Sequence, residues 1–220
     1  MGHIGQEIRR IKELLPAGVE LVAVSKFHPV SSIEEAYRAG QRLFGESRVQ
    51  ELLDKIPRLP DDIRWHFIGH LQTNKVKQLI GKTALIESVD SERLLDLIDR
   101  LSAEKGVVTR VLLQVHVARE ETKFGFTPDE LLAYFRDRKF ENLRAVHIYG
   151  LMGMASNTDD TDRIRDDFHA IAELRRDILE MCPDLRGFDT LSMGMSDDFP
   201  IAIREGSTLI RIGTAIFGSR

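Results

Sequence analysis

The sequence predicts a (β/α)8 barrel of the TIM type. From residue 19 onward, eight strand-like segments follow one another, and a segment with helical periodicity fills each gap between them. Strands that alternate with helices of this length are typical of parallel βαβ units. The eight units fit within about 200 residues, with no Pro- or Ser-rich linker between them, which is enough chain for one barrel.

A doubly wound open sheet is the alternative fold for this order of elements. Its buried parallel strands would contain longer unbroken runs of Val and Ile. Several strands of this chain instead contain polar residues, namely Gln114, His116 and His147, which the lumen of a barrel can hold near its mouth. The polar residues therefore favour the closed barrel.

The first predicted element is an amphipathic helix, residues 3–15. Ile8 and Ile11 are two of its regularly spaced apolar residues, and Pro16 follows the last helical residue. We expect this helix to pack on the barrel, so that residues 1–220 form one domain.

The barrel elements are predicted from aliphatic runs for the strands, and from periodicity and capping residues for the helices. The predicted strands are residues 19–26, 42–46, 64–68, 84–89, 109–118, 143–149, 190–193 and 209–217. The predicted helices are residues 31–40, 49–56, 75–80, 91–104, 128–138, 161–181 and 198–205. The first of these helices begins at two serines and ends at a glycine, as helices commonly do.

Composition and charge exclude several classes of protein. Of the 220 residues, 42% are hydrophobic and 30% are charged, with a formal net charge of −4. No apolar run approaches the roughly 20 residues of a membrane helix, and the slight acidity disfavours a nucleic-acid surface. Cys182 is the only cysteine, which excludes an internal disulfide and fits a reducing compartment. We expect a soluble, cytoplasmic monomer that binds neither nucleic acid nor a membrane.

Lys26 is the last residue of the first predicted strand. A charged side chain is unusual in a buried strand, because the ion prefers water. Because side chains alternate along a strand, Val22, Val24 and Lys26 share one face. If the two valines fill the lumen, the Lys26 amine points into the carboxyl-terminal mouth, where barrel enzymes place their reactive groups. A partly dry mouth disfavours the charged amine, which can then form a Schiff base with a carbonyl. The alternative is a lysine that extends past the strand into solvent.

Glycines and hydroxyl residues follow the seventh and eighth predicted strands, where barrels commonly bind phosphate. Glycine lets backbone N–H groups approach an anion closely, and hydroxyl groups add further donors. Ser196 is also placed to cap the helix that follows it. The alternative is that these segments are only tight turns. We expect the phosphate to be bound by Ser192, Gly194, Gly213 and Thr214.

A strand-end lysine together with a phosphate site is compatible with two kinds of protein. One is a protein that binds pyridoxal 5′-phosphate (PLP), and the other is a Schiff-base aldolase that acts on a sugar phosphate. The residues alone leave both open.

An ordered set of motifs resembles the pyridoxal phosphate homeostasis proteins, which are similar to the barrel domain of alanine racemase. The resemblance extends from about residue 19 to the last residue. The motifs are AVSKFHP, FGESRVQE, WHFIGHLQTNKV, SVDS, KFGF, GLMGMAS and LSMGMSDDFPIAIREGSTLIRIGTAIFG.

The resemblance implies PLP as the cofactor and Lys26 as the lysine that forms the Schiff base. It also implies that Arg211 faces the pyridine nitrogen and that Gly213 and Thr214 bind the phosphate. Many relatives have FGEN where this chain has FGES, so Ser47 replaces an asparagine near the ring. The segment that matches the family's serine- and glycine-rich stretch contributes Ser192, Met193, Gly194 and Ser196.

The resemblance further implies a role in PLP homeostasis, in which the protein holds the cofactor and supplies PLP-dependent enzymes. A racemase needs a second acid or base, which racemase-like enzymes take from an additional C-terminal domain, whereas this chain ends at Arg220. An arginine at the pyridine nitrogen also weakens the ring as an electron sink. We therefore expect no catalytic residue. The alternative is an amino-acid racemase whose second base is Tyr149, His147 or a partner subunit's residue.

His66 and His70 have a spacing that on a helix could bind a metal ion. They instead lie across the end of a predicted strand, and no set of carboxylates follows them. We expect no metal site.

Overall fold

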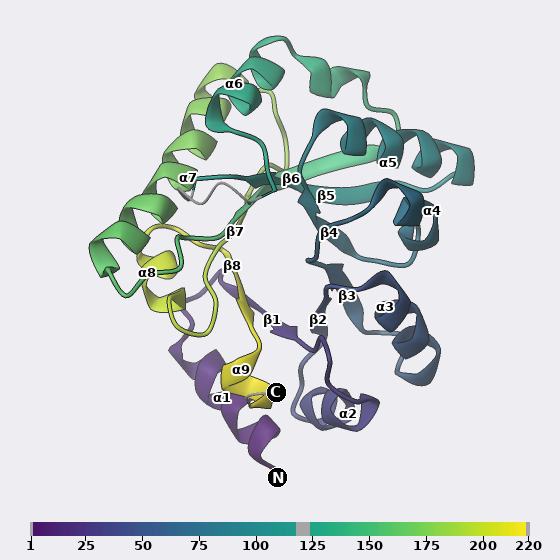
Figure 1. The fold of residues 1–220 in the computed structure, drawn as a ribbon, viewed down its shortest axis with the longest axis vertical. Coiled ribbons are helices and arrows are strands. Elements are labelled where there is room, and N and C mark those ends of the chain that lie inside the picture. Colours follow the sequence, from purple (N-terminus) through teal and green to yellow (C-terminus); the bar gives the residue numbers. More distant parts are fainter. Residues whose placement is uncertain (1, 118–123, 219–220) are drawn as a thin grey trace.

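The chain folds into a closed barrel of eight parallel strands arranged in chain order, with helices on the outside (Figure 1). The structure, a computed structural model, describes residues 2–117 and 124–218. The barrel closes between its first and last strands, where Val22 lies opposite Arg211. The predicted fold class is confirmed.

The eight strands correspond one to one with the predicted segments. They are β1 (Glu20–Val24), β2 (Leu43–Glu46), β3 (Arg64–Phe67), β4 (Leu85–Val89), β5 (Thr109–Val115), β6 (Val146–Gly153), β7 (Thr190–Ser192) and β8 (Leu209–Ile212).

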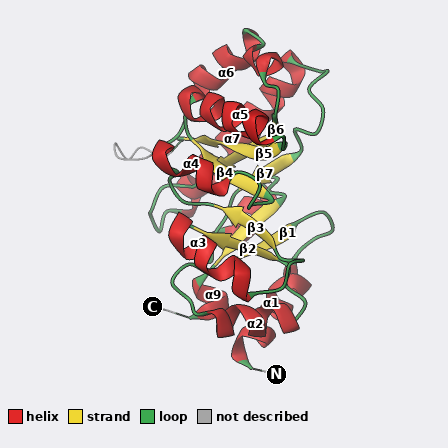
Figure 2. Ribbon diagram, turned by 90° about the vertical axis from the view of Figure 1, so that its right-hand side faces the viewer, coloured by secondary structure: helices red, strands yellow, loops and turns green. Residues whose placement is uncertain are grey.

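The helices surround the strands (Figure 2). The α-helices are α1 (His3–Leu14), α2 (Val30–Arg38), α3 (Val49–Lys55), α4 (Val76–Leu79), α5 (Glu92–Lys105), α6 (Pro128–Arg136), α7 (Thr161–Met181), α8 (Phe199–Arg204) and α9 (Thr214–Phe217). Short 3-10 helices occupy Ile56–Arg58, Thr73–Lys75 and Lys139–Asn142. Of the helices in these described ranges, none is long and apolar enough to cross a bilayer.

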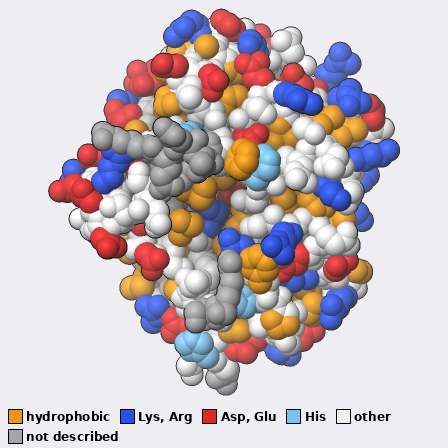
Figure 3. All heavy atoms as spheres, in the orientation of Figure 1, with side chains coloured by type: hydrophobic (Ala, Val, Ile, Leu, Met, Phe, Trp, Pro, Cys, Tyr) orange, Lys and Arg blue, Asp and Glu red, His pale blue; other side chains and the backbone are white. Residues whose placement is uncertain are grey.

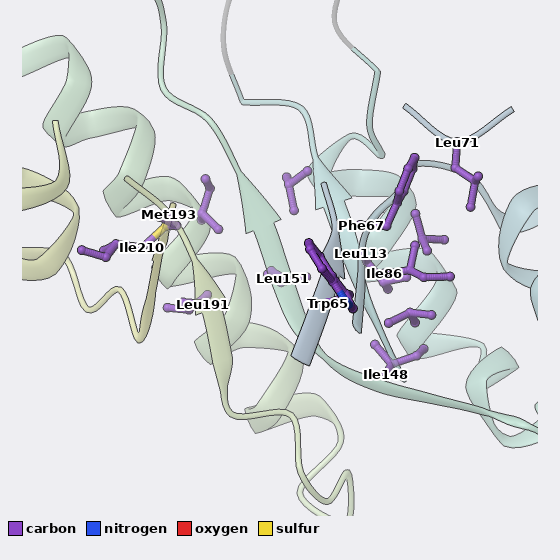
Figure 4. Close-up of a cluster of buried hydrophobic side chains, with 14 of the residues drawn as sticks. Trp65, Phe67, Leu71, Ile86, Leu113, Ile148, Leu151, Leu191, Met193 and Ile210 are labelled. Atoms are coloured by element: carbon purple, nitrogen blue, oxygen red, sulfur yellow. The ribbon is translucent and has the colours of Figure 1, made fainter. Parts of the chain in front are cut away.

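Side chains that alternate along the strands form two apolar layers. The inner layer fills the lumen. The outer layer lies between strands and helices, and Figure 4 shows part of it. On β1, Val22 belongs to the inner layer, whereas Leu21 and Ala23 belong to the outer one. This confirms the alternation predicted for the first strand. The inner layer consists of Val22, Leu43, Leu85, Leu112, Met152 and Leu209.

The first helix, α1, lies beside α2 and α9, so the first and last helices of the chain are neighbours (Figure 1). Ile8 and Ile11 on its apolar face are buried in the outer layer. The apolar face of α1 is therefore covered by its neighbours.

Several strands end at other residues than predicted near the carboxyl-terminal mouth. β1 ends at Val24, and Lys26 lies in the turn that follows it. β8 ends at Ile212, because the chain turns at Gly213 into the short helix α9, whereas the sequence predicted a strand to residue 217. β5 ends at Val115, before its predicted end at Ala118, which itself lies outside the described residues.

β6 begins at Val146 and ends at Gly153, so both ends lie later than predicted. The strand extends further because Gly150 lies within it and does not end it. Gly150 has φ +149°, a conformation that favours glycine, and the register between β5 and β6 shifts beside Leu112. A Cβ at position 150 would overlap the carbonyl oxygen of Thr190 on β7. Gly150 therefore lets the strand continue to Gly153, which brings Met152 to the carboxyl-terminal mouth.

We expect Gly150→Ala to destabilise the fold strongly. The unfavourable backbone conformation alone costs about 1–3 kcal/mol, and the overlap with β7 adds to this cost. Gly40→Ala is the control, since Gly40 also has positive φ but would meet no atom within 4 Å. Its cost should be only the backbone part, about 1–2 kcal/mol. Urea unfolding measures both, and equal losses of stability would contradict this account of β6.

Candidate functional site

A cavity of about 240 Å³ lies at the carboxyl-terminal mouth of the barrel. Near the middle of the face shown in Figure 3, Lys and Arg side chains lie beside hydrophobic side chains. The wall of the cavity has the same mixed character, because apolar and polar residues both line it. It is formed by Val24, Lys26, His28, Ser47, Ile68, Met152, Met154, Met195, Ser196, Asp197, Arg211, Gly213, Thr214 and Gly218.

Six of the nine residues predicted for the site line this cavity, although they come from different parts of the chain. These residues are Lys26, Ser47, Ser196, Arg211, Gly213 and Thr214. Their assembly is a consequence of barrel closure, which brings β1 and β8 together.

The other three predicted residues, Ser192, Met193 and Gly194, lie behind the wall. Ser192 is fully buried, and its hydroxyl and carbonyl oxygens both accept hydrogen bonds from Arg211. Gly194 has φ +95°, and a Cβ there would lie 2.7 Å from the Cβ of Ala202. The backbone N–H of Met193 donates to the carbonyl of Leu209. In this arrangement the three residues support the wall, and their direct contact with a ligand stays a prediction.

The turn that carries Lys26 is held on both of its flanks. Phe27 has φ +68°, which is unusual for a residue with a side chain. Its N–H donates to Glu51 Oε1 (2.6 Å), and Lys55 Nζ donates to the carbonyl of Ser25 (2.9 Å). Contacts with α3 therefore fix the backbone immediately before and after Lys26.

Lys55 is itself a buried cation that is paired with two carboxylates. Its Nζ lies 2.8 Å from Glu46 Oε1 and 2.6 Å from Glu51 Oε1. Burial raises the pKa of Glu46, although hydrogen bonds from Lys55 and Ser25 act in the opposite direction. This cluster lies directly behind the Lys26 turn and gives that turn a polar, hydrogen-bonded support.

Arg211 forms the floor of the cavity and is 5% exposed. Its Nη1 donates to the carbonyl of Ser192 (2.7 Å), and its Nη2 donates to the carbonyl of Gly153 (3.0 Å). Glu87 Oε2, on β4, lies 3.8 Å from Nη1. Burial lowers the pKa of Arg211, while the negative charge of Glu87 counteracts this effect. The floor is therefore a guanidinium in a fixed orientation.

Glu87 is fully buried in the lumen, and its carboxylate accepts two short hydrogen bonds. One comes from Ser192 Oγ (2.5 Å), and the other joins Oε1 to His66 Nδ1 (2.6 Å). Burial raises the pKa of Glu87, but the His66 hydrogen bond and the charges of His66 and Arg211 outweigh it. The pKa consequently lies below its ordinary value. Glu87 was not predicted, and its only signal in the sequence is a carboxylate beside Ser88 in a short strand whose other residues are apolar.

Ser196 and Thr214 meet at the edge of the cavity. Thr214 Oγ1 donates to Ser196 Oγ (2.9 Å), which also accepts from the N–H of Ala215 (3.4 Å). The prediction that Ser196 caps the helix after it is wrong, because Asp198 occupies the residue before α8. The Ser196 hydroxyl instead accepts from two residues of α9, Thr214 and Ala215. The result is a pair of hydroxyl groups beside Gly213.

Several residues that line the cavity were not predicted. His28 stacks on Phe217 of α9, with 4.9 Å between the ring centroids, so it joins the Lys26 turn to the end of the barrel. Ile68, Met154 and Met195 supply apolar surface. The methionines could have been found from the two MGM repeats, which the sequence places at strand ends.

Tyr149 and His147, the candidate second bases of a racemase, lie at the opposite mouth. Tyr149 lines a separate cavity there. His147 is exposed near the start of β6, and its ring contacts the carbonyl of Arg186, so the prediction that it faces the lumen is wrong. Neither side chain lines the cavity that contains Lys26.

His66 and His70 take part in different hydrogen bonds. His66 binds Glu87, whereas His70 Nδ1 lies 3.0 Å from Asp90 Oδ2. Among residues 2–117 and 124–218, no group of three or more His, Cys, Asp or Glu side chains is placed to hold a metal ion. The polar side chains that line the cavity are Lys26, His28, Ser47, Ser196, Asp197, Arg211 and Thr214.

Comparison with known families gives matches over most of the chain. The model of the alanine racemase N-terminal domain matches residues 1–220. The pyridoxal phosphate homeostasis protein of Aquifex aeolicus is 43% identical over 202 residues, which cover 91% of this chain and 87% of that protein. The human protein of the same name is 40% identical over 224 residues, covering 96% of this chain and 80% of that protein.

Solved structures also resemble the chain. PipY of Synechococcus elongatus PCC7942 without PLP has a TM-score of 0.93 at 38% identity, covering 98% of this chain and 100% of that chain. The same protein with PLP bound has a TM-score of 0.89 at 37% identity and the same coverage. Alanine racemase from E. faecalis is 18% identical with a TM-score of 0.74, covering 99% of this chain and 58% of that chain, and it shares the fold alone.

The lowered pKa of Glu87 predicts how acid affects stability. The ionised carboxylate stabilises the folded state above the ordinary carboxyl pKa of about 4.3, and this contribution is lost as the pH falls through the lower folded-state value. The stability difference between wild type and Glu87→Gln should therefore be largest near neutral pH and shrink in acid. Urea unfolding at several pH values measures it. Glu104→Gln, at an exposed helix pair, is the control and should show a small difference at every pH.

Proposed function

This chain belongs to the alanine racemase N-terminal domain family and, within it, to the pyridoxal phosphate homeostasis proteins, and on that premise we propose that it binds PLP through Lys26 and serves PLP homeostasis. The observation that carries the proposal is the placement of Lys26, Arg211, Ser196 and Thr214 around one cavity. Relatives that share this fold include PipY, of which a structure with PLP bound is known.

The residues present fit the chemistry of the cofactor. PLP supplies an aldehyde that reacts with amines, and it carries a phosphate and a pyridine ring. The cavity offers an amine at Lys26 and the buried guanidinium of Arg211, together with apolar surface from Ile68 and Met152. These groups of the protein therefore match the chemistry of the aldehyde and the ring of the cofactor.

We assign the covalent attachment to Lys26. Its amine nitrogen adds to the aldehyde carbon, a C=N bond forms, and one water molecule leaves. The turn is held by Glu51 and Lys55 at its flanking backbone groups, so the amine enters the cavity from a fixed point. Fixing the backbone in advance lowers the conformational cost of binding.

The phosphate is assigned to the hydroxyl pair of Ser196 and Thr214 with the backbone at Gly213. Hydroxyl and N–H groups donate to a phosphate, and hydrogen bonds to a charged acceptor are roughly twice as strong as neutral ones. Arg211 is assigned to the pyridine nitrogen and Ser47 to the ring. Ser192, Met193 and Gly194 would act by holding this wall in place.

We propose that the protein carries the cofactor without substantial turnover of amino acids. A guanidinium at the pyridine nitrogen disfavours protonation of the ring, and Glu87 with the carbonyls of Ser192 and Gly153 holds that guanidinium in place. Tyr149 and His147 lie at the other mouth, away from the cavity. The relatives are named homeostasis proteins, which supports a carrier over the alternative racemase. As a carrier, we expect a cytoplasmic monomer that supplies PLP-dependent enzymes.

Replacement of the lysine tests the attachment. Wild-type protein mixed with PLP and reduced with borohydride should gain the mass of a pyridoxyl group, and Lys26→Ala should not. Lys82→Ala, at an exposed lysine outside the cavity, is the matched control and should behave like wild type. An unchanged mass gain in Lys26→Ala would overturn the assignment of Lys26.

Exchange of the Cα proton tests the absence of turnover. A missing general acid or base typically lowers a rate by about 10²–10⁴-fold, so PLP-loaded protein in deuterated water should exchange Cα–H of alanine or serine far below ordinary enzymatic rates. NMR follows the loss of the proton signal. Exchange or racemisation at ordinary enzymatic rates would favour the racemase over the carrier.

A further inference from the structure

A second cavity, of about 410 Å³, opens at the amino-terminal mouth of the barrel. His66 on β3 lines it, and this side chain is otherwise buried, with 6% of its surface exposed. Its Nδ1 is bonded to Glu87, and across the described ranges Nε2 has no hydrogen-bond partner in the protein. The free ring nitrogen of His66 is therefore available to solvent through this second cavity.

A continuous chain of hydrogen bonds joins His66 to the floor of the PLP cavity. His66 Nδ1 binds Glu87 Oε1 (2.6 Å), Ser192 Oγ donates to Glu87 Oε2 (2.5 Å), and Arg211 Nη1 donates to Ser192 Oγ (2.5 Å). The four residues come from β3, β4, β7 and β8, so the chain crosses the lumen. All four are buried. One end of the chain faces each mouth.

We propose that this chain is a proton-linked connection between the two mouths: His66 takes up a proton from the amino-terminal cavity, and Glu87 and Ser192 transmit the change in charge to Arg211. The inference rests on the proposed function for its consequence, which is regulation of PLP retention. His66 and Glu87 act as positioning residues, because they reach the cofactor through Arg211.

The charges of the chain explain the direction of the effect. With a neutral imidazole, Glu87 balances Arg211 and the chain has no net charge. With an imidazolium, the chain carries one positive charge, and Glu87 is shared between two cations. In a buried site this positive charge acts over a longer range than in water. It therefore attracts the cofactor, which is anionic as a whole, while Arg211 still faces the pyridine nitrogen. Anion binding in turn favours protonation of His66, since coupling between sites is reciprocal.

The other charged side chains of the amino-terminal cavity each contact a partner of their own. Arg64 pairs with Glu20 (3.2 Å), Arg110 lies over the ring of Tyr149, and Asp189 lies 3.7 Å from Arg175. Within the described residues, Glu87 is the only side chain bonded to His66. A change in the charge of His66 therefore acts mainly on Glu87, to which it is hydrogen-bonded. The ionisable side chains of the cavity wall besides His66 are Glu20, Arg64, Arg110, Tyr149 and Asp189.

PLP retention at different pH values tests the connection. His66→Asn keeps an amide donor near the position of Nδ1 but takes up no proton. We expect PLP to dissociate about 5-fold or more faster from His66→Asn than from wild type at the acid end of the tested pH range, with the ratio falling toward one as the pH rises. His147→Asn, at the same mouth but outside the chain, is the control and should follow wild type at every pH. A ratio for His66→Asn that is constant with pH overturns the proposal.

A measurement without cofactor separates this proposal from the proposed function. In ¹⁵N-labelled protein free of PLP, protonation of His66 should shift the side-chain signals of Arg211 in the same titration, and Glu87→Gln should abolish that shift. His66→Asn and Arg211→Lys assign the signals. If wild type fails to bind PLP but this shift is present, the function is wrong and the connection stands. If PLP binds and the shift is absent, the connection is wrong and the function stands.

Discussion

An ionised guanidinium inside the lumen of a small barrel is the constraint on which the rest of the site depends. A buried charge without a partner is strongly unfavourable, so Arg211 needs acceptors from several strands at once. Glu87 on β4 supplies the negative charge that balances Arg211. The carbonyls of Gly153 on β6 and Ser192 on β7 accept hydrogen bonds from Arg211. The orientation of the cavity floor is thus set by three strands that are distant in sequence.

The turn that carries Lys26 is also supported by a buried cation, in this case Lys55. Lys55 is buried behind the Lys26 turn, and its charge is balanced by Glu46 and Glu51. Its remaining hydrogen bond goes to the backbone beside Lys26. In both places the group presented to the cavity is held in position by residues that do not line the cavity.

The local sequence pattern was sufficient to predict the fold and many of the residues that line the cavity. It did not predict the buried residues that hold them in place. The barrel, the alternation on β1 and the placement of Lys26 and Thr214 near one mouth follow from strand order and period. The course of β6 does not, because glycine usually weakens a strand and only the neighbouring β7 shows why Gly150 is needed. The role of Glu87 also depends on a partner 105 residues away, which no local pattern contains.

Closure of the sheet limits how other proteins can recognise this one. An open sheet has edge strands with unpaired backbone groups, to which another chain can add a strand. Here β1 pairs with β8, so the barrel has no such edge. A partner therefore cannot add a strand to this sheet, and it would instead contact the surrounding helices and loops. Partner choice can then change through surface substitutions while the barrel and its buried charges stay the same.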